Sequence, residues 1–229
     1  MAKIKMTAIV ADIRNKLNGT VFSKNRGGAY MRTKVTPSNP QTSFQSLVRS
    51  RLAAFAAGFR ALTAAQISAW NSSTSNFTGT DVFGDVKVPS GINLYIKLNT
   101  NLDRIAVAAI ASPPLPVAVA SVDTASAVVD FSSQSVTVTF TPSPVPADTS
   151  FVIRATKQVS PGRKFVKNLL TDIAVVAAAG TSPTVITTAY IAKYGAVVLG
   201  QRIGFQIVPI NAVTGQAGPG IVFDTIVVA

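Results

Sequence analysis

The sequence contains no cysteine, no histidine and no glutamate, so its nine acidic residues are all aspartates. Without cysteine there are no disulfides, and without cysteine and histidine there is no zinc site of the usual kind. The groups that most often transfer protons or activate a nucleophile near neutral pH are therefore missing. Paired aspartates or a Ser–Lys arrangement stay conceivable, but the aspartates stand singly along the chain. We expect a protein that is not an enzyme, with no catalytic residue, no cofactor and no metal.

Charges and long apolar runs are also scarce. Only 13% of the 229 residues are charged, whereas 48% are hydrophobic. The chain can therefore fill a core, but its surface is weakly polar, which is typical of proteins whose faces are covered by neighbours. No apolar run approaches the roughly 18–20 residues that span a bilayer. The short apolar stretch at 7–11 runs directly into charged residues, unlike a signal peptide, and we expect no membrane contact.

The charge that is present is concentrated at the beginning of the chain. Eleven of the 21 lysines and arginines occur in the first 60 residues, where Asp12 is the only acid. This segment carries a formal charge of +10 out of a total of +12, so the rest of the chain is nearly neutral. A basic segment joined to a neutral apolar body predicts that the segment binds something negative or rich in hydrogen-bonding groups.

Residues 1–40 are predicted to form an extended basic arm. Alternating apolar residues in 1–14 indicate an edge strand, and the Asn18-Gly19 dipeptide indicates a hairpin turn. In the stretch that follows, bases and aromatics surround a pair of glycines, and we select six arm residues as the interface: Phe22, Lys24, Arg26, Tyr30, Arg32 and Lys34. Such a stretch can grip phosphates and stack on nucleobases. It can also pack onto a neighbouring subunit, which we favour because a single basic–aromatic stretch is not specific.

Residues 41–111 are predicted to form a small helical domain. Pro40 marks a helix start, and apolar residues three or four apart continue one stripe to about Phe59. Thr63 opens a second helix through a T-x-x-Q capping box, and Ser90 caps a third. The second helix contains no lysine or arginine, so we do not expect it to enter a DNA groove.

Residues 112–229 are predicted to form an antiparallel β-sandwich domain, which makes the whole chain an α+β protein. The domain begins with a proline-rich linker, and short segments of alternating polar and apolar residues follow, separated by glycine and proline turns. Seven or more such segments predict a sandwich. The candidate strands are 135–141, 150–157, 173–177, 185–187, 196–199, 203–210 and 221–228.

Several of these segments resemble the strands of a fibronectin type III domain. The stretch 135–142 (SVTVTFTP) is similar to the second strand of that family, with Phe140 in the place of its tryptophan. The stretch 151–154 (FVIR) is similar to the third strand. The region from 199 onwards is similar to the corner, sixth strand and closing turn, with Phe205 where the family has a corner tyrosine. The resemblance implies a module for packing or adhesion without chemistry of its own.

A second resemblance covers roughly residues 15–105. It is carried by LNGTVFSKNRGG at 17–28, VTPSNPQT at 35–42, LTAAQISAW at 62–70, and SGIN at 90–93 with Asn99. These motifs resemble a group of structural proteins from tailed bacteriophages of Bacteroidetes hosts, including crAss-like phages. The resemblance implies a virion component, assembled in the host cytoplasm.

We therefore expect a structural protein of a phage particle, either capsid-associated (auxiliary or decoration) or part of the head–tail neck. Its partners would be capsid, portal or neck subunits, in a homo-oligomer or symmetric assembly. Two alternatives stay open. One is a non-specific nucleic-acid-binding protein packaged with the genome. The other is a receptor-binding or adhesion module that uses the sandwich loops, with 160–168 as the candidate contact.

Overall fold

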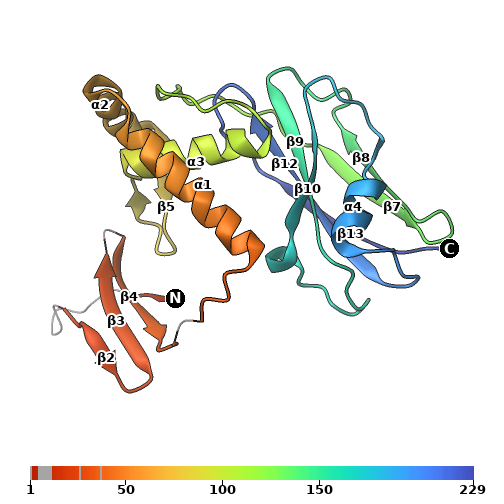
Figure 1. Cartoon of the computed structure of the whole chain (residues 1–229), viewed down its shortest axis with the longest axis horizontal. Coiled ribbons are helices and arrows are strands. Elements are labelled where there is room, and N and C mark those ends of the chain that lie inside the picture. The colour runs from red at the N-terminus through yellow and green to blue at the C-terminus, as the bar shows by residue number, and fades with distance from the viewer. Residues whose placement is uncertain (1, 5–11, 26, 37) are drawn as a thin grey trace.

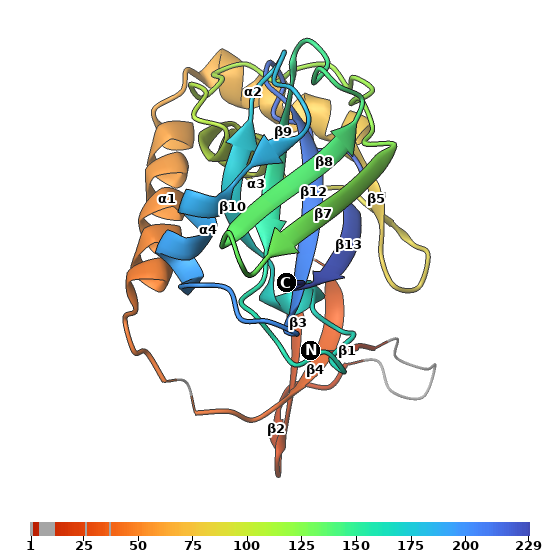
Figure 2. The ribbon, with the colours of Figure 1, turned by 90° about the vertical axis from the view of Figure 1, so that its right-hand side faces the viewer.

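The computed structural model describes residues 2–4, 12–25, 27–36 and 38–229. The fold is α+β, and every pair of neighbouring strands in its sheets is antiparallel. Figure 1 shows three parts in chain order: a small sheet at the N-terminus, a group of helices, and a body made of two β-sheets. Figures 1 and 2 both show the N-terminal sheet projecting away from the other two parts.

The N-terminal sheet replaces the predicted extended arm, which is a correction to that prediction. Four strands lie in the order β1-β4-β3-β2: β1 Ala2–Lys3, β2 Asn15–Leu17, β3 Thr20–Asn25 and β4 Gly28–Thr33. The chain turns between β2 and β3 at Asn18, whose φ of 50° is left-handed, so the predicted hairpin is confirmed. A second reversal uses Gly28 at a φ of 102°. Two tight turns let this segment pair with itself, whereas the sequence analysis predicted only the first of them. Most of the predicted edge strand over 1–14 lies outside the described residues.

Three helices and a short hairpin follow: α1 Ser43–Arg60, α2 Ala64–Ser73, the 3₁₀ turn η1 Thr74–Phe77, β5 Gly79–Thr80, β6 Val86–Lys87 and α3 Gly91–Arg104. The capping box at Thr63 and the cap at Ser90 are confirmed. The start of α1 differs from the prediction, because Thr42 caps it by accepting a hydrogen bond from the Gln45 N–H at 3.3 Å. Among the described residues no single helix is long and apolar enough to cross a bilayer. Helix α1 and the following segment 64–77 are long and apolar enough only when they are taken together, and the chain bends by 114° between them.

The helices share a small core around Trp70, which is completely buried. The rings of Trp70 and Tyr95 meet edge to face with centroids 5.3 Å apart, and Phe59 packs against Tyr95 in the same way. The indole N–H of Trp70 donates to the Ala111 carbonyl at 2.8 Å, which ties the segment after α3 to this core. Trp70 therefore lies at the centre of the core that the three helices share.

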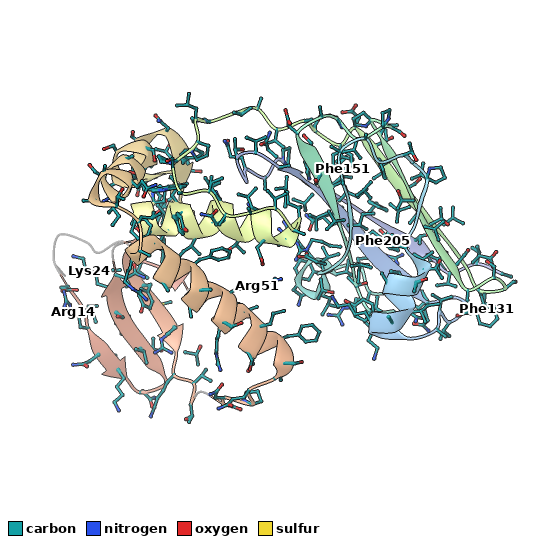
Figure 3. All side chains as sticks on the ribbon, turned by 45° about the horizontal axis from the view of Figure 1, so that its top comes forward. Arg14, Lys24, Arg51, Phe131, Phe151 and Phe205 are labelled. Atoms are coloured by element: carbon teal, nitrogen blue, oxygen red, sulfur yellow. The ribbon has the colours of Figure 1, made fainter. Side chains whose placement is uncertain are left out.

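The C-terminal body consists of two facing antiparallel sheets, of orders β11-β8-β7 and β10-β9-β12-β13. Their strands are β7 Thr124–Asp130, β8 Ser135–Thr141, β9 Thr149–Ala155, β10 Thr171–Val176, β11 Thr184–Val185, β12 Arg202–Asn211 and β13 Ile221–Ile226. Phe140 of one sheet and Phe151 of the other meet edge to face in the shared core, with ring centroids 5.4 Å apart. Figure 3 labels Phe151 and Phe205 in this interior.

One prediction in this body is wrong, because the segment 196–199 is not a strand. The sequence analysis also did not foresee that residues 187–194 form a helix, α4 Thr187–Tyr194. Helix α4 packs against β8 of one sheet and β10 of the other, and its Tyr190 is completely buried there. The Tyr190 hydroxyl donates to the Thr156 carbonyl at 3.1 Å. Strand β7 was also missed, because its small side chains give only weak alternation.

A charged cluster joins the helices to the body. Arg104 at the end of α3 donates two hydrogen bonds to the Asp172 carboxylate of β10, at 2.8 and 2.9 Å. The guanidinium of Arg154 lies 3.2 Å from the same carboxylate. Nearer the start of α3, a Cβ at Gly215 would lie only 2.3 Å from the Leu98 carbonyl, so a glycine is required where α3 meets the loop after β12. These contacts fix the position of α3 relative to β10.

Candidate docking surface

None of the described side chains before Phe59 is buried. This stretch includes the N-terminal sheet and most of α1, which together make up about a quarter of the chain. Regular secondary structure is normally stabilised by the apolar face that it buries. The described residues of this stretch therefore form strands and a helix without a buried core of their own.

The register of the N-terminal sheet separates its side chains into two faces. Phe22 pairs with Met31, and these residues share a face with Leu17 and Lys24 because side chains alternate along a strand. The opposite face carries Tyr30 and, beside it, Val21, Arg32 and Lys16.

The predicted interface residues are consequently not all together. Phe22 and Lys24 lie on one face, whereas Tyr30 and Arg32 lie on the other. Lys34 follows the end of β4, where its N–H donates to the Gly19 carbonyl at 2.8 Å. Arg26 lies outside the described residues. Figure 3 shows Lys24 and Arg14 on the part of the sheet that is far from the β-body.

An ion pair attaches the N-terminal sheet to the β5–β6 hairpin. The Lys3 ammonium lies 2.6 Å from the Asp81 carboxylate. This hydrogen bond, with the backbone N–H groups of Phe83 and Asp85, lowers the pKa of Asp81, although burial acts in the opposite direction. A cleft of about 570 Å³ lies beside the pair, lined in part by Gly27, Lys87, Ser90 and Asn93. Across the described ranges, no group of three or more acidic, histidine or cysteine side chains could hold a metal ion.

Helix α1 carries an apolar stripe of which only the C-terminal half is packed against other residues. Phe59 at its end is buried in the small helical core and Phe55 is partly covered. The N-terminal half of the stripe is open, with Phe44 65% exposed and Val48 64% exposed. The predicted stripe is continuous along α1, but only its C-terminal end packs on the helical core, because the N-terminal half of α1 diverges from α3 (Figure 1).

A groove of about 470 Å³ separates this open half of α1 from the β-body. It is lined by Phe44, Leu47, Val48 and Arg51 of α1, by Thr171 and Asp172 of β10, and by Lys193 and Tyr194 of α4. The Lys193 ammonium lies 5.8 Å from the ring centroids of both Phe44 and Tyr194, and it donates to the main-chain carbonyl of Asp172 at 2.7 Å. Burial lowers the pKa of Lys193, and Asp172 partly offsets this effect.

The wall of the groove is stiffened by pairs of charged side chains. Arg51 reaches from α1 to Asp103 of α3, with 2.8 Å between guanidinium and carboxylate, and Figure 3 shows its side chain between the two helices. Arg104 and Arg154 hold Asp172 on the other side. The sequence analysis did not identify this groove, because Lys193 and Tyr194 lie far from α1 along the chain and belong to a helix that was not predicted.

Comparisons with protein-family models, with curated proteins and with solved structures find no match for this chain.

Proposed function

We propose that this protein is a non-enzymatic structural component of a tailed-bacteriophage virion, either capsid-associated or part of the head–tail neck. In this proposal it docks onto neighbouring subunits through its N-terminal region. The observation that carries the proposal is that no described side chain before Phe59 is buried. A small sheet and a half-exposed helix without a core gain stability when another subunit covers their apolar faces.

The roles of the aspartates support a structural rather than a catalytic protein. Asp103, Asp172 and Asp224 each face an arginine, and Asp130 accepts hydrogen bonds from the N–H groups of a turn. These turn contacts lower the pKa of Asp130. Asp130 is therefore kept ionised and is poorly suited to exchange a proton near neutral pH.

We further propose that residues 112–229 are a fibronectin type III-like module. The first, second and fifth strands of the body share one sheet, and the third, fourth, sixth and seventh share the other. In the constant-type immunoglobulin arrangement the fourth strand would instead join the first sheet. The pairing of β10 with β9 favours the fibronectin variant. Phe205 lacks the hydroxyl of a corner tyrosine, but Tyr190 supplies a buried hydroxyl that bonds the backbone after β9.

The distribution of bases favours protein docking over the nucleic-acid alternative. Lys3, Lys16 and Arg32 lie on one face of the N-terminal sheet, where Lys3 is paired with Asp81, and Lys24 lies on the other face. Among the described residues, neither face therefore presents a continuous platform of unpaired bases. A genome-binding protein would bind random duplex DNA with an affinity that falls steeply as salt increases. We expect weak binding without this steep dependence.

Deletion of residues 1–35 tests the docking role. Because this segment contributes no described buried side chain, the truncated protein should lose only the signal of the N-terminal sheet and should keep the melting transition of the helices and the β-body. Its copy number in purified particles, measured by quantitative mass spectrometry, should fall to background. Truncated protein that is incorporated at the normal copy number would show that the N-terminal region is not the docking device.

A further inference from the structure

The groove between α1 and the β-body has an apolar floor and a cation at its rim. Phe44, Leu47 and Val48 supply the apolar side, and all three are at least 47% exposed. Lys193 lies over the rings of Phe44 and Tyr194 from the opposite side. The volume of the groove, about 470 Å³, falls within the roughly 300–1,000 Å³ typical of ligand-binding clefts. Apolar side chains of another molecule can enter this space without displacing a folded element.

The charges around the groove are predominantly positive. Both acids, Asp103 and Asp172, are already held by arginines. Lys193 instead donates to a main-chain carbonyl, so its charge is available for a carboxylate of a partner.

The net charge of the chain indicates whether the groove binds a second copy of this chain or a different, acidic protein. A second copy of this chain would bring a further formal charge of +12, concentrated in the same basic N-terminal segment. Like charges on two facing surfaces oppose association, whereas an acidic surface would be attracted to this one. Charge complementarity thus favours an acidic partner over self-association.

We propose that the groove binds an acidic amphipathic helix of a partner protein. The apolar side chains of that helix would rest on Phe44, Leu47 and Val48, and one of its carboxylates would meet Lys193. This is the helix-in-groove mode of recognition, in which apolar anchors give affinity and the flanking charges give selectivity. The inference deepens the proposed docking function by naming the chemistry of the partner, and it rests on that function.

A synthetic peptide serves as the probe: a fluorescein-labelled 16-residue helix with leucine and phenylalanine on one face and glutamate on the other. Its binding to the full chain is followed by fluorescence anisotropy. Two groove variants, Phe44→Ala and Lys193→Gln, should each weaken binding about tenfold, the effect of losing a central contact. Two controls, Phe165→Ala and Lys97→Gln, should leave it unchanged. Phe165 is a close match because it is 68% exposed, against 65% for Phe44. Melting curves establish that all four variants are folded.

Several outcomes would overturn the inference. They are the absence of binding, equal weakening by groove and control variants, and equal binding of a peptide with lysine in place of glutamate. Displacement of the peptide by random duplex DNA, in a manner that depends on Lys193, would assign the groove to nucleic acid instead. The deletion of residues 1–35 leaves every groove residue in place. Loss of particle incorporation on deletion and loss of peptide binding in the groove variants therefore report on the virion role and on the groove separately.

Discussion

The first 58 residues and the C-terminal body differ in where their apolar side chains lie. In the body, Phe151, Phe205 and their neighbours are fully buried between two sheets. In the first 58 residues, the side chains of Phe44, Val48 and Leu17 are mostly exposed, although their sequence is equally rich in regular structure. In the proposed function, the body is stable by itself, whereas another subunit covers the exposed apolar side chains of the N-terminal region. The proposal thus assigns a scaffold to one region and a docking element to the other.

A matched pair of phenylalanines gives the largest expected contrast between the two regions. Phe151→Ala should lower the free energy of unfolding by about 3–5 kcal/mol, because it empties a packed site between the sheets. Phe44→Ala should change it by about 0.5 kcal/mol or less, because the ring is 65% exposed. Urea unfolding followed by far-ultraviolet circular dichroism measures both. A large loss for Phe44→Ala would mean that α1 is part of the scaffold.

The junction between the helices and the body should give a smaller effect. Asp172→Asn removes the carboxylate that holds Arg104 and Arg154. Because Asp172 is 44% exposed, solvent screens this cluster and we expect a loss of about 1 kcal/mol.

The same substitution should also loosen α3, so that the amides of its last turn exchange faster with solvent. Asp148→Asn, an equal loss of charge at an exposed turn, is the control and should have no effect on α3. Unchanged exchange in α3 after Asp172→Asn would show that packing around Gly215 alone holds the junction.

The smallest expected effect concerns the contact between Lys3 and Asp81. The pKa of Asp81 is held below its ordinary value of 3.8, so its stabilising contribution is complete above that value and is lost as the pH falls through the lower, folded-state pKa. In the Lys3→Met variant the pKa of Asp81 should move back up. Titration of the side-chain carboxyl by NMR measures this, and an unchanged pKa in the variant would show that the turn N–H groups alone perturb Asp81.

Local sequence signals predicted the elements that they govern directly. The alternation in 135–141 gave the bounds of β8, and the capping residues Thr63 and Ser90 gave the starts of α2 and α3. The sequence could not show that the N-terminal segment pairs with itself, because an edge strand has the same pattern whether its partner is its own chain or another. It also missed α4, whose residue before the first turn makes no side-chain cap.

The candidate surface was only partly predictable for a related reason. Periodicity identified the stripe on α1, but periodicity states which side chains share a face and not what covers that face. The groove depends on the meeting of α1 with Lys193, and this is set by the junction at Asp172, a long-range contact without a local signal.

Hydrogen exchange of the free, full-length protein tests the central claim most directly. If the N-terminal region lacks a core until a partner covers it, the amides of β3 and β4 should exchange on the order of a hundredfold or more faster than those of β9 and β12. Protection in β3 and β4 equal to that in β9 and β12 would contradict the account, because it would show that the N-terminal region is stably folded without a partner.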